Sequence, residues 1–186
     1  MCGANINPLF PSATMAKWGL PGHACKRDLI GEVIRALKAK GIQVVLYTHP
    51  RDGHDMNTAD QITTGWGPGP GGYNPDWSRF DRRKWNDFIN DIYADLIDRY
   101  GSRIDGMFID EGSPYGDSWR VVDYPRLRQT VKSRQPDLLM MHNFYGDNYS
   151  CDIGATEVSY WQAWVPGTNP DNWPATGRPM SMVMGS

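Results

Sequence analysis

Polar side chains with acid–base chemistry follow three short apolar runs of this chain, at the point where each run ends. The runs are IQVVLYT at 42–48, IDGMFI at 104–109 and LLMMH at 138–142. The polar residues at their ends are His49, Asp110, Glu111, His142 and Asn143. If the runs are parallel strands, their carboxyl ends share one edge of a sheet, where barrel enzymes place reactive groups. The pattern predicts an acid–base site at that edge.

Asp110 is the leading candidate for a catalytic carboxylate, because it directly follows MFI. A carboxylate at the carboxyl end of a barrel strand has few stabilising roles, although it can cap the next loop. Adjacent strand residues point to opposite faces, so an inward Asp110 turns Glu111 toward the helix layer or the loop. Glu157, in the strand-like segment ATEVSYW, is a second candidate, with a solvated edge charge as the alternative.

No metal or disulfide framework is expected. His49 and His142 have the chemistry to bind sugar hydroxyls or a metal, but the chain contains no HxH or HxxxH spacing. The three cysteines are far apart, and an odd count argues against a disulfide framework, although one bridge remains open.

The elements that would position these residues follow from hydrophobic periodicity. Apolar residues at helical spacing predict helices at 26–40, 84–100 and 124–135, with Asp123 as an N-cap and Pro125 in the first turn. The three apolar runs predict buried strands, and 153–164 and 179–184 predict two more. The Gly-, Pro- and Asn-rich stretch 49–83 is expected to be a long loop.

Alternation of helices with short strands implies a parallel α/β sheet, either a barrel or a doubly wound sheet. The absence of a glycine-rich phosphate turn and the polar strand ends favour the barrel. A complete (β/α)₈ barrel needs roughly 250 residues. We therefore expect the 186 residues to form one truncated catalytic-barrel domain, residues 1–186.

Composition excludes several classes of partner. The net charge is −2 with scattered basic residues, so neither a nucleic-acid face nor a basic membrane patch is expected. No apolar stretch approaches the roughly 20 residues of a membrane helix, and the N-terminus does not resemble a signal peptide. Aromatic faces stack on the apolar faces of sugars, which makes Trp66 and Trp161 candidates for carbohydrate binding.

Several segments resemble the α-L-fucosidase family. RDLIGEVIRALKAKGIQVVLYTHP is similar to a family helix opening with RDLV-x-E that leads to a strand ending in LYYS. WNDFINDIYADLIDRYGSRIDGMFIDEG resembles the segment ending in YG-x-IDGLWFDG, and LRQTVKSRQPDLLMMHN the helix ending in QPD. NPLFPSATMAKWG and RPMSMVMGS are similar to FALWPSKTTDWN and WETCMTMGDSWGY. The resemblance spans nearly the whole chain and implies a partial (β/α)₈ TIM barrel, roughly strands 2 to 6.

This resemblance implies a retaining glycosidase without a cofactor, acting on a fucosylated glycan or oligosaccharide. Asp110 would be the nucleophile and Glu157 the acid/base, about 5–5.5 Å apart. The family resemblance implies a secreted, periplasmic or lysosomal compartment. The chain departs from the pattern at Phe144, where the family often has Arg, and at Glu111, where it has Gly. The family's His-His-Asp-Gly motif would fall before Met1.

Three alternatives remain open. Another barrel glycosidase would use Glu111, or a Glu beyond these residues, and act on a different sugar. A non-catalytic relative would bind carbohydrate through Trp66, Trp77 and Trp161. A doubly wound domain would bind a small phosphorylated ligand. A truncated barrel would also expose unpaired sheet edges, through which the chain is expected to self-associate.

Overall fold

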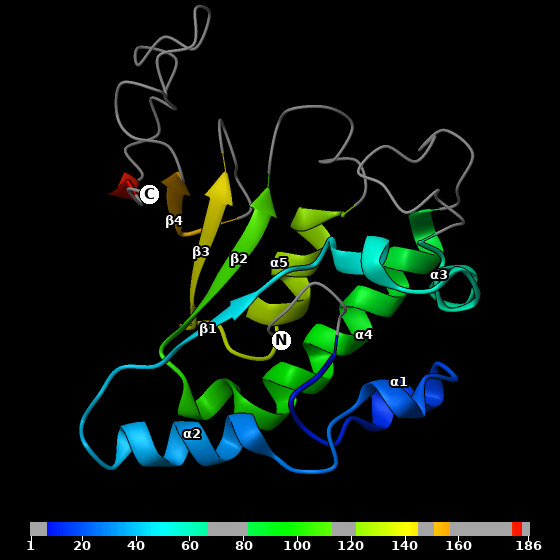
Figure 1. Ribbon diagram of the computed structural model, residues 1–186. Helices are drawn as coiled ribbons and strands as arrows, with labels where there is room; N and C mark the ends of the chain where they lie inside the picture. Colours follow the sequence, from blue (N-terminus) through cyan, green and yellow to red (C-terminus); the bar gives the residue numbers. More distant parts are fainter. Residues whose placement is uncertain (1–6, 67–81, 113–121, 145–150, 157–179, 184–186) are drawn as a thin grey trace, which may run out of the picture.

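The protein has a mixed α/β fold built on a parallel sheet (Figure 1). The computed structural model describes residues 7–66, 82–112, 122–144, 151–156 and 180–183. The strands follow one another in the order β1-β2-β3-β4-β5, and every neighbouring pair is parallel. Their bounds are Val45–Thr48 (β1), Gly106–Gly112 (β2), Leu139–Phe144 (β3), Ile153–Thr156 (β4) and Met180–Val183 (β5). The expected parallel pairing of the first two strands is confirmed.

Three longer helices alternate with these strands: α2 (Leu29–Lys38), α4 (Arg82–Tyr100) and α5 (Tyr124–Lys132). Local signals set their ends. The Asp28 carboxylate accepts the Gly31 N–H at 2.9 Å and caps the start of α2. Gly41, in the turn that follows the helix, has a left-handed conformation with a φ of 71°. Asp123 caps α5 by accepting the Arg126 N–H at 3.0 Å, with Pro125 in the first turn, as expected.

Short elements complete the described chain: α1 (Ala13–Lys17), η1 (Pro21–His23), η2 (Asp52–Asp55), α3 (Thr58–Thr64) and η4 (Gly101–Arg103). The stretch 49–83 was expected to be loop throughout, but it contains η2 and α3. Two residues explain α3. Asn57 accepts the Asp60 N–H at 3.0 Å as the N-cap, and Gly65 ends the helix in the left-handed conformation at a φ of 79°.

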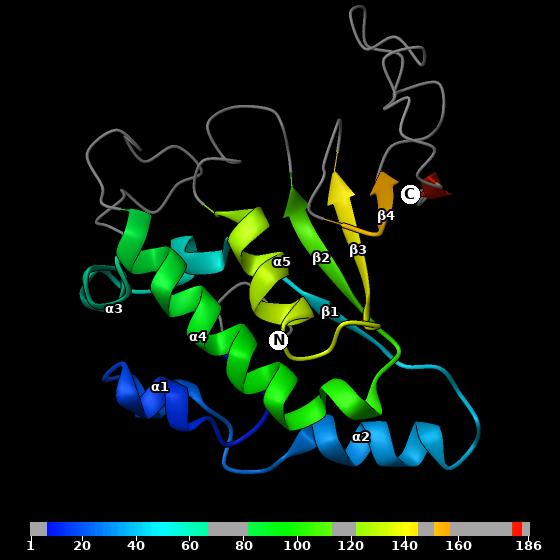
Figure 2. The same ribbon diagram turned by 180° about the vertical axis from the view of Figure 1, so that it is seen from behind.

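One face of the sheet packs against the helices (Figures 1 and 2). Met107 and Ile109 of β2 and Met140 of β3 join a single hydrophobic core with the buried sides of the three longer helices. In α4 this side is nearly inaccessible to solvent and comprises Trp85, Phe88, Ile89, Ile92, Tyr93, Leu96 and Ile97. The helical stripe read from the sequence of α4 is therefore the core side of that helix.

The other face of β1 is open in the described part of the chain. Val45 and Tyr47 are 43% and 42% exposed, whereas Thr48 on the helix side is fully buried. The sequence predicted a strand buried on both faces, but the helices cover only one. Tyr47 stacks on Phe108 of β2, with ring centroids 5.6 Å apart. Tyr47 and Phe108 are thus neighbours on the face that points away from the helices.

A repeated arrangement fixes the amino-terminal edge of the sheet. Before β2, the Asp105 carboxylate accepts the Val44 N–H at 2.7 Å and pairs with Lys38 at the end of α2. Before β4, the Asp152 carboxylate accepts the Met140 N–H at 2.9 Å and pairs with Lys132 at the end of α5. Each carboxylate joins a strand to the last turn of the helix before it.

A buried hydroxyl pair ties α4 to the first two strands. Tyr93 donates to Thr48 Oγ1 at 2.7 Å, and Thr48 donates to the Phe108 carbonyl at 3.2 Å. These two hydrogen bonds link the helix to both strands.

Tyr93→Phe should lower the free energy of unfolding by about 1–2 kcal/mol, because the buried Thr48 hydroxyl loses the hydrogen bond that it accepts. Thr48→Val should cost a similar amount, and the double variant little more than either. Urea unfolding of the three variants measures this. Additive losses would contradict the coupling.

Candidate active site

Asp110 lies at the carboxyl end of β2, on the sheet face that points away from the helices. Its neighbours Ile109 and Met107 belong to the helix-facing core, whereas Asp110 contacts Tyr47, which stacks on Phe108 on the other face. The Asp110 residue is 5% exposed. Tyr47 of β1 donates its hydroxyl hydrogen to Asp110 Oδ2. The structure thus places a buried carboxylate beside a phenol at the edge where the sequence predicted a site.

The pairing of β2 with β3 is irregular at Asp110. Ile109 pairs with His142 and Gly112 with Phe144, so Asp110 and Glu111 together stand opposite the single residue Asn143. Such a bulge adds one residue to a strand and changes the direction of the side chains around it. Bulges are frequent beside active sites. The regular alternation of β2 therefore stops at the candidate carboxylate.

His49 completes a compact group around Asp110. Its Nε2 lies 2.6 Å from the Tyr47 hydroxyl oxygen and 3.5 Å from Asp110 Oδ2. Its Nδ1 lies 3.4 Å from Oδ2 of Asp52, in η2. Asp52 is 3% exposed, so the imidazole sits between two buried carboxylates. The group can hold or move a proton, and it presents charge at the carboxyl edge of the sheet.

The segment that carries His49 and Asp52 is fixed by contacts from α3 and α4. The Trp85 indole N–H donates to the Pro50 carbonyl at 3.2 Å, and the Gln61 amide donates to the Gly53 carbonyl at 3.1 Å. A Cβ on Gly53 would lie 2.3 Å from Cδ2 of the Trp66 ring. Only glycine therefore allows η2 to pack this closely on Trp66.

Trp66 is part of the hydrophobic core. It is 2% exposed, and its ring packs edge-on against Trp85 at 4.7 Å. The sequence pointed to Trp66 as a sugar-binding residue. The structure instead puts it in the hydrophobic core, directly against Gly53 of η2.

His142 is at the carboxyl end of β3 but on the helix side of the sheet. It pairs with Ile109, is 1% exposed, and lies against Tyr124 of α5 with ring centroids 4.4 Å apart. Burial lowers the pKa of His142 to about 3, and the Asp110 charge only partly opposes this. His142 is therefore a neutral ring inside the fold near neutral pH, and the structure does not bring it to the face that holds Tyr47.

The remaining predicted site residues lie partly or wholly outside the described part of the structure. Glu111 and Asn143 lie in β2 and β3, but their side chains fall outside the described part of the structure. Glu157, Trp77 and Trp161 lie outside the described residues. The structure brings His49 together with Asp110 and leaves the separation of Asp110 from Glu157 as a prediction.

Two residues of the group were missed in the sequence. Tyr47 stands two residues before His49, which is the spacing that puts two side chains on one face of a strand. Asp52 follows His49 by three residues, within one helical turn. The two-residue spacing could have identified Tyr47 as a neighbour of His49. The contact between Asp52 and His49 depends on the packing of η2, which no local spacing encodes.

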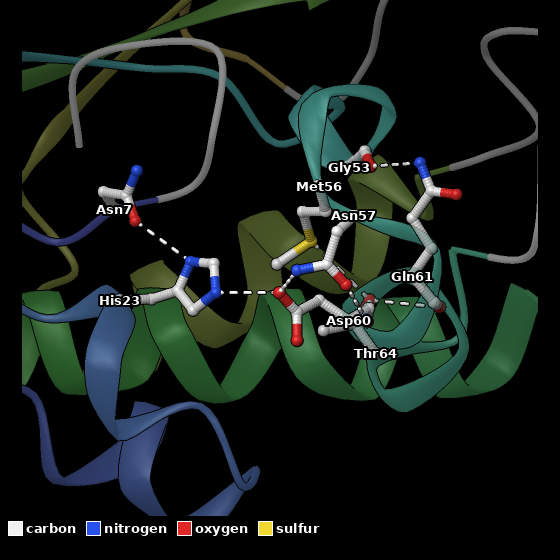
Figure 3. A network of polar contacts seen from close by, with 8 residues as sticks. All are labelled: Asn7, His23, Gly53, Met56, Asn57, Asp60, Gln61 and Thr64. Atoms are coloured by element: carbon white, nitrogen blue, oxygen red, sulfur yellow. Dashed lines mark hydrogen bonds and ion pairs between the residues drawn. The ribbon is translucent and has the colours of Figure 1, made fainter. Parts of the chain in front are cut away.

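A second histidine–carboxylate contact lies apart from this group (Figure 3). His23 Nε2 is 2.9 Å from Asp60 Oδ2, and its Nδ1 is 3.1 Å from the Asn7 side-chain oxygen. The contact ties η1 to α3. Asp60 is also held by its backbone N–H bond to Asn57, the N-cap of α3. This cluster joins two surface elements and contains no residue of the group around Asp110.

The described residues form no cluster of three or more His, Cys, Asp or Glu side chains suited to a metal ion. None of the described helices combines the length and apolar character needed to cross a bilayer. No protein-family model matches the chain, and no curated protein sequence matches it significantly. Function is therefore inferred from the geometry of the site and from the motif resemblance.

Burial of His142 predicts a pH-dependent stability. The unfolded chain binds a proton near the ordinary pKa of 6.5, whereas the folded chain resists protonation down to about 3. The stability is thus fully present above the unfolded pKa and falls as the pH drops through this window. Between about pH 7.5 and about pH 5, the free energy of unfolding of the wild type should fall by about 2 kcal/mol more than that of His142→Gln. Denaturant unfolding at the two pH values measures the difference, and equal losses would refute a neutral buried ring.

Proposed function

We propose that this chain hydrolyses glycosidic bonds by a retaining mechanism, with the Asp110 carboxylate as the nucleophile. The observation that carries the proposal is the placement of Asp110 at the carboxyl end of β2, at a bulge and on the face away from the helices. Tyr47 and His49 contact one oxygen of this carboxylate. Donors around a buried carboxylate stabilise its ionised form, which is the form that a nucleophile needs.

The sheet supports a barrel as the framework of this activity. Sequential order of parallel strands is what consecutive units of a (β/α)₈ barrel have, whereas a doubly wound sheet reverses its strand order. We propose that β1 to β5 correspond to a part of such a barrel, roughly strands 2 to 6. Active sites of these barrels lie at the carboxyl edge of the strands, which is the edge that holds Asp110.

The proposed reaction has two steps. An Asp110 oxygen forms a bond to the anomeric carbon while the glycosidic oxygen leaves with a proton from the acid/base. A water molecule, deprotonated by the same acid/base, then attacks the anomeric carbon and releases Asp110. By the motif resemblance, Glu157 is the acid/base and the sugar is α-L-fucose in a glycan or oligosaccharide. No cofactor takes part in this scheme.

Asp110→Asn should lower kcat on an aryl α-L-fucoside by about 10⁴-fold or more, because an amide cannot form the glycosyl-enzyme. Asp105→Asn is the matched control, since it makes the same change on the same polypeptide segment at the opposite edge of the sheet. The control should lose stability and retain kcat. Chromophore release and thermal unfolding of both purified variants provide the two measurements.

A second substitution at the same position, together with Asp110→Asn, distinguishes the alternatives. In Asp110→Gly, added azide should restore turnover and give the glycosyl azide of inverted configuration, because azide enters the space of the missing carboxylate. Turnover unaffected by Asp110→Asn would refute the assignment and direct attention to Glu111. A wild-type chain that binds oligosaccharides without cleaving any aryl glycoside in a panel of sugars would identify a carbohydrate-binding protein instead.

Glu157→Gln tests the second carboxylate. Loss of a general acid slows cleavage of poor leaving groups most, by about 10²–10⁴-fold, and affects activated aryl leaving groups less. We therefore expect a much larger fall in kcat/KM for a fucosyl disaccharide than for a dinitrophenyl fucoside. Equal losses on both substrates would exclude Glu157 as the acid.

A further inference from the structure

The His49 imidazole is flanked by a carboxylate at each ring nitrogen. Asp52 Oδ2 lies 3.4 Å from Nδ1, and Asp110 Oδ2 lies 3.5 Å from Nε2. The three side chains are well shielded, with exposed fractions of 20% for His49, 5% for Asp52 and 7% for Asp110. Two buried negative charges on opposite sides of one ring favour a positive charge on that ring.

The hydrogen bonds of Tyr47 set the proton count. The Tyr47 hydroxyl has one hydrogen, and when Asp110 is ionised it donates this hydrogen to Asp110 Oδ2. Its oxygen also lies 2.6 Å from His49 Nε2, so Nε2 must supply the hydrogen of that contact. Nδ1 lies 3.4 Å from an oxygen of Asp52 without the alignment of a hydrogen bond, and the negative charge of that carboxylate repels a lone pair and attracts an N–H. With a proton on each nitrogen, the ring is an imidazolium.

We propose that Asp52 is a positioning residue that keeps His49 protonated, and that His49 exchanges a proton with Asp110 through the Tyr47 hydroxyl. Asp52 and Asp110 lie beside different ring nitrogens of His49. Asp52 acts through His49 and thereby holds Asp110 in its ionised form. The charge state of His49 stands on this geometry alone, whereas its effect on turnover rests on the proposed function.

The proton transfer is balanced. When Asp110 is protonated, its O–H donates to the Tyr47 oxygen and the Tyr47 O–H donates to a neutral His49 Nε2. Transfer moves the Asp110 proton to the Tyr47 oxygen and the Tyr47 proton to Nε2. The products are an Asp110 carboxylate, an unchanged phenol and an imidazolium. Asp52, beside Nδ1, stabilises the product state more than the reactant state, because only the product ring carries a positive charge.

Nitrogen-15 NMR of the histidine rings tests the charge state without any assay of activity. Ring nitrogens with and without a proton differ widely in chemical shift. The chain has four histidines, and His→Gln variants of each assign the signals. At neutral pH, wild-type His49 should show two protonated nitrogens. A His49 ring with one bare nitrogen would overturn the proposal.

Asp52→Asn tests the positioning role. The amide has the shape of the carboxylate but no charge, so one His49 nitrogen should lose its proton at neutral pH. Asp60→Asn is the matched control, because Asp60 makes the second histidine–carboxylate contact, with its Oδ2 2.9 Å from His23 Nε2 (Figure 3). The control should alter the His23 signals and leave the His49 signals unchanged. Retention of both His49 protons in Asp52→Asn would overturn the role of Asp52.

Kinetics test the coupling to Asp110. Asp52→Asn should lower kcat about 10–100-fold, the range typical of a residue behind a reactive group, and change KM little, because Asp52 acts through His49. Asp60→Asn should keep wild-type kcat. A neutral His49 with wild-type kcat in Asp52→Asn would overturn the coupling. A cationic His49 in a wild-type chain that cleaves no glycoside would refute the proposed function and leave the charge assignment standing.

Discussion

The register between β1 and β2 is the constraint on which the candidate site depends. Val45 pairs with Gly106 and Thr48 with Ile109, so alternate residues of both strands share a face. Leu46 and Met107 face the helices, which leaves Tyr47 beside Phe108 on the other face. A shift of one residue would turn the side chains of one strand to the opposite face and separate Tyr47 from Asp110. The hydrophobic core under α4 therefore also determines which polar groups meet at the carboxyl edge.

The carboxylates at the two ends of β2 have different partners. At the amino edge, Asp105 accepts the N–H of Val44, the residue before β1, and pairs with Lys38, and the hydrogen bond from Lys38 lowers the pKa of Asp105. Asp152 repeats this arrangement two strands later. Burial alone would raise the pKa of Asp152, but hydrogen bonds from Arg128 and Lys132 bring it below its ordinary value. These permanent cations fix the edge of the sheet. Asp110, at the carboxyl edge, is held instead by a phenol and an imidazole.

Hydrophobic patterns were enough to locate the three longer helices and the first three strands, because each of these helices buries a continuous apolar side and each of these strands begins in a short apolar run. The caps Asp123 and Asn57 show where such patterns were not enough. The first was read correctly beside a strong apolar repeat, whereas the second begins the seven-residue helix α3, whose Ile62 is 57% exposed. A short helix without an apolar side leaves little periodic signal. Likewise, the face to which His142 points and the depth of Trp66 depend on tertiary packing that no local pattern encodes.

The difference between Asp152 and Asp110 suggests how a site can be separated from a structural ion pair. Asp152 is neutralised by Arg128 at 2.6 Å and Lys132 at 2.7 Å, which stay charged across the physiological range, so no proton moves there. Asp52 and Asp110 share one imidazole, which titrates within that range when unperturbed. A shared titratable partner is a poor choice for stability alone, because its charge changes with pH. It is useful where a carboxylate must be held ionised, and this is the state that a carboxylate nucleophile requires.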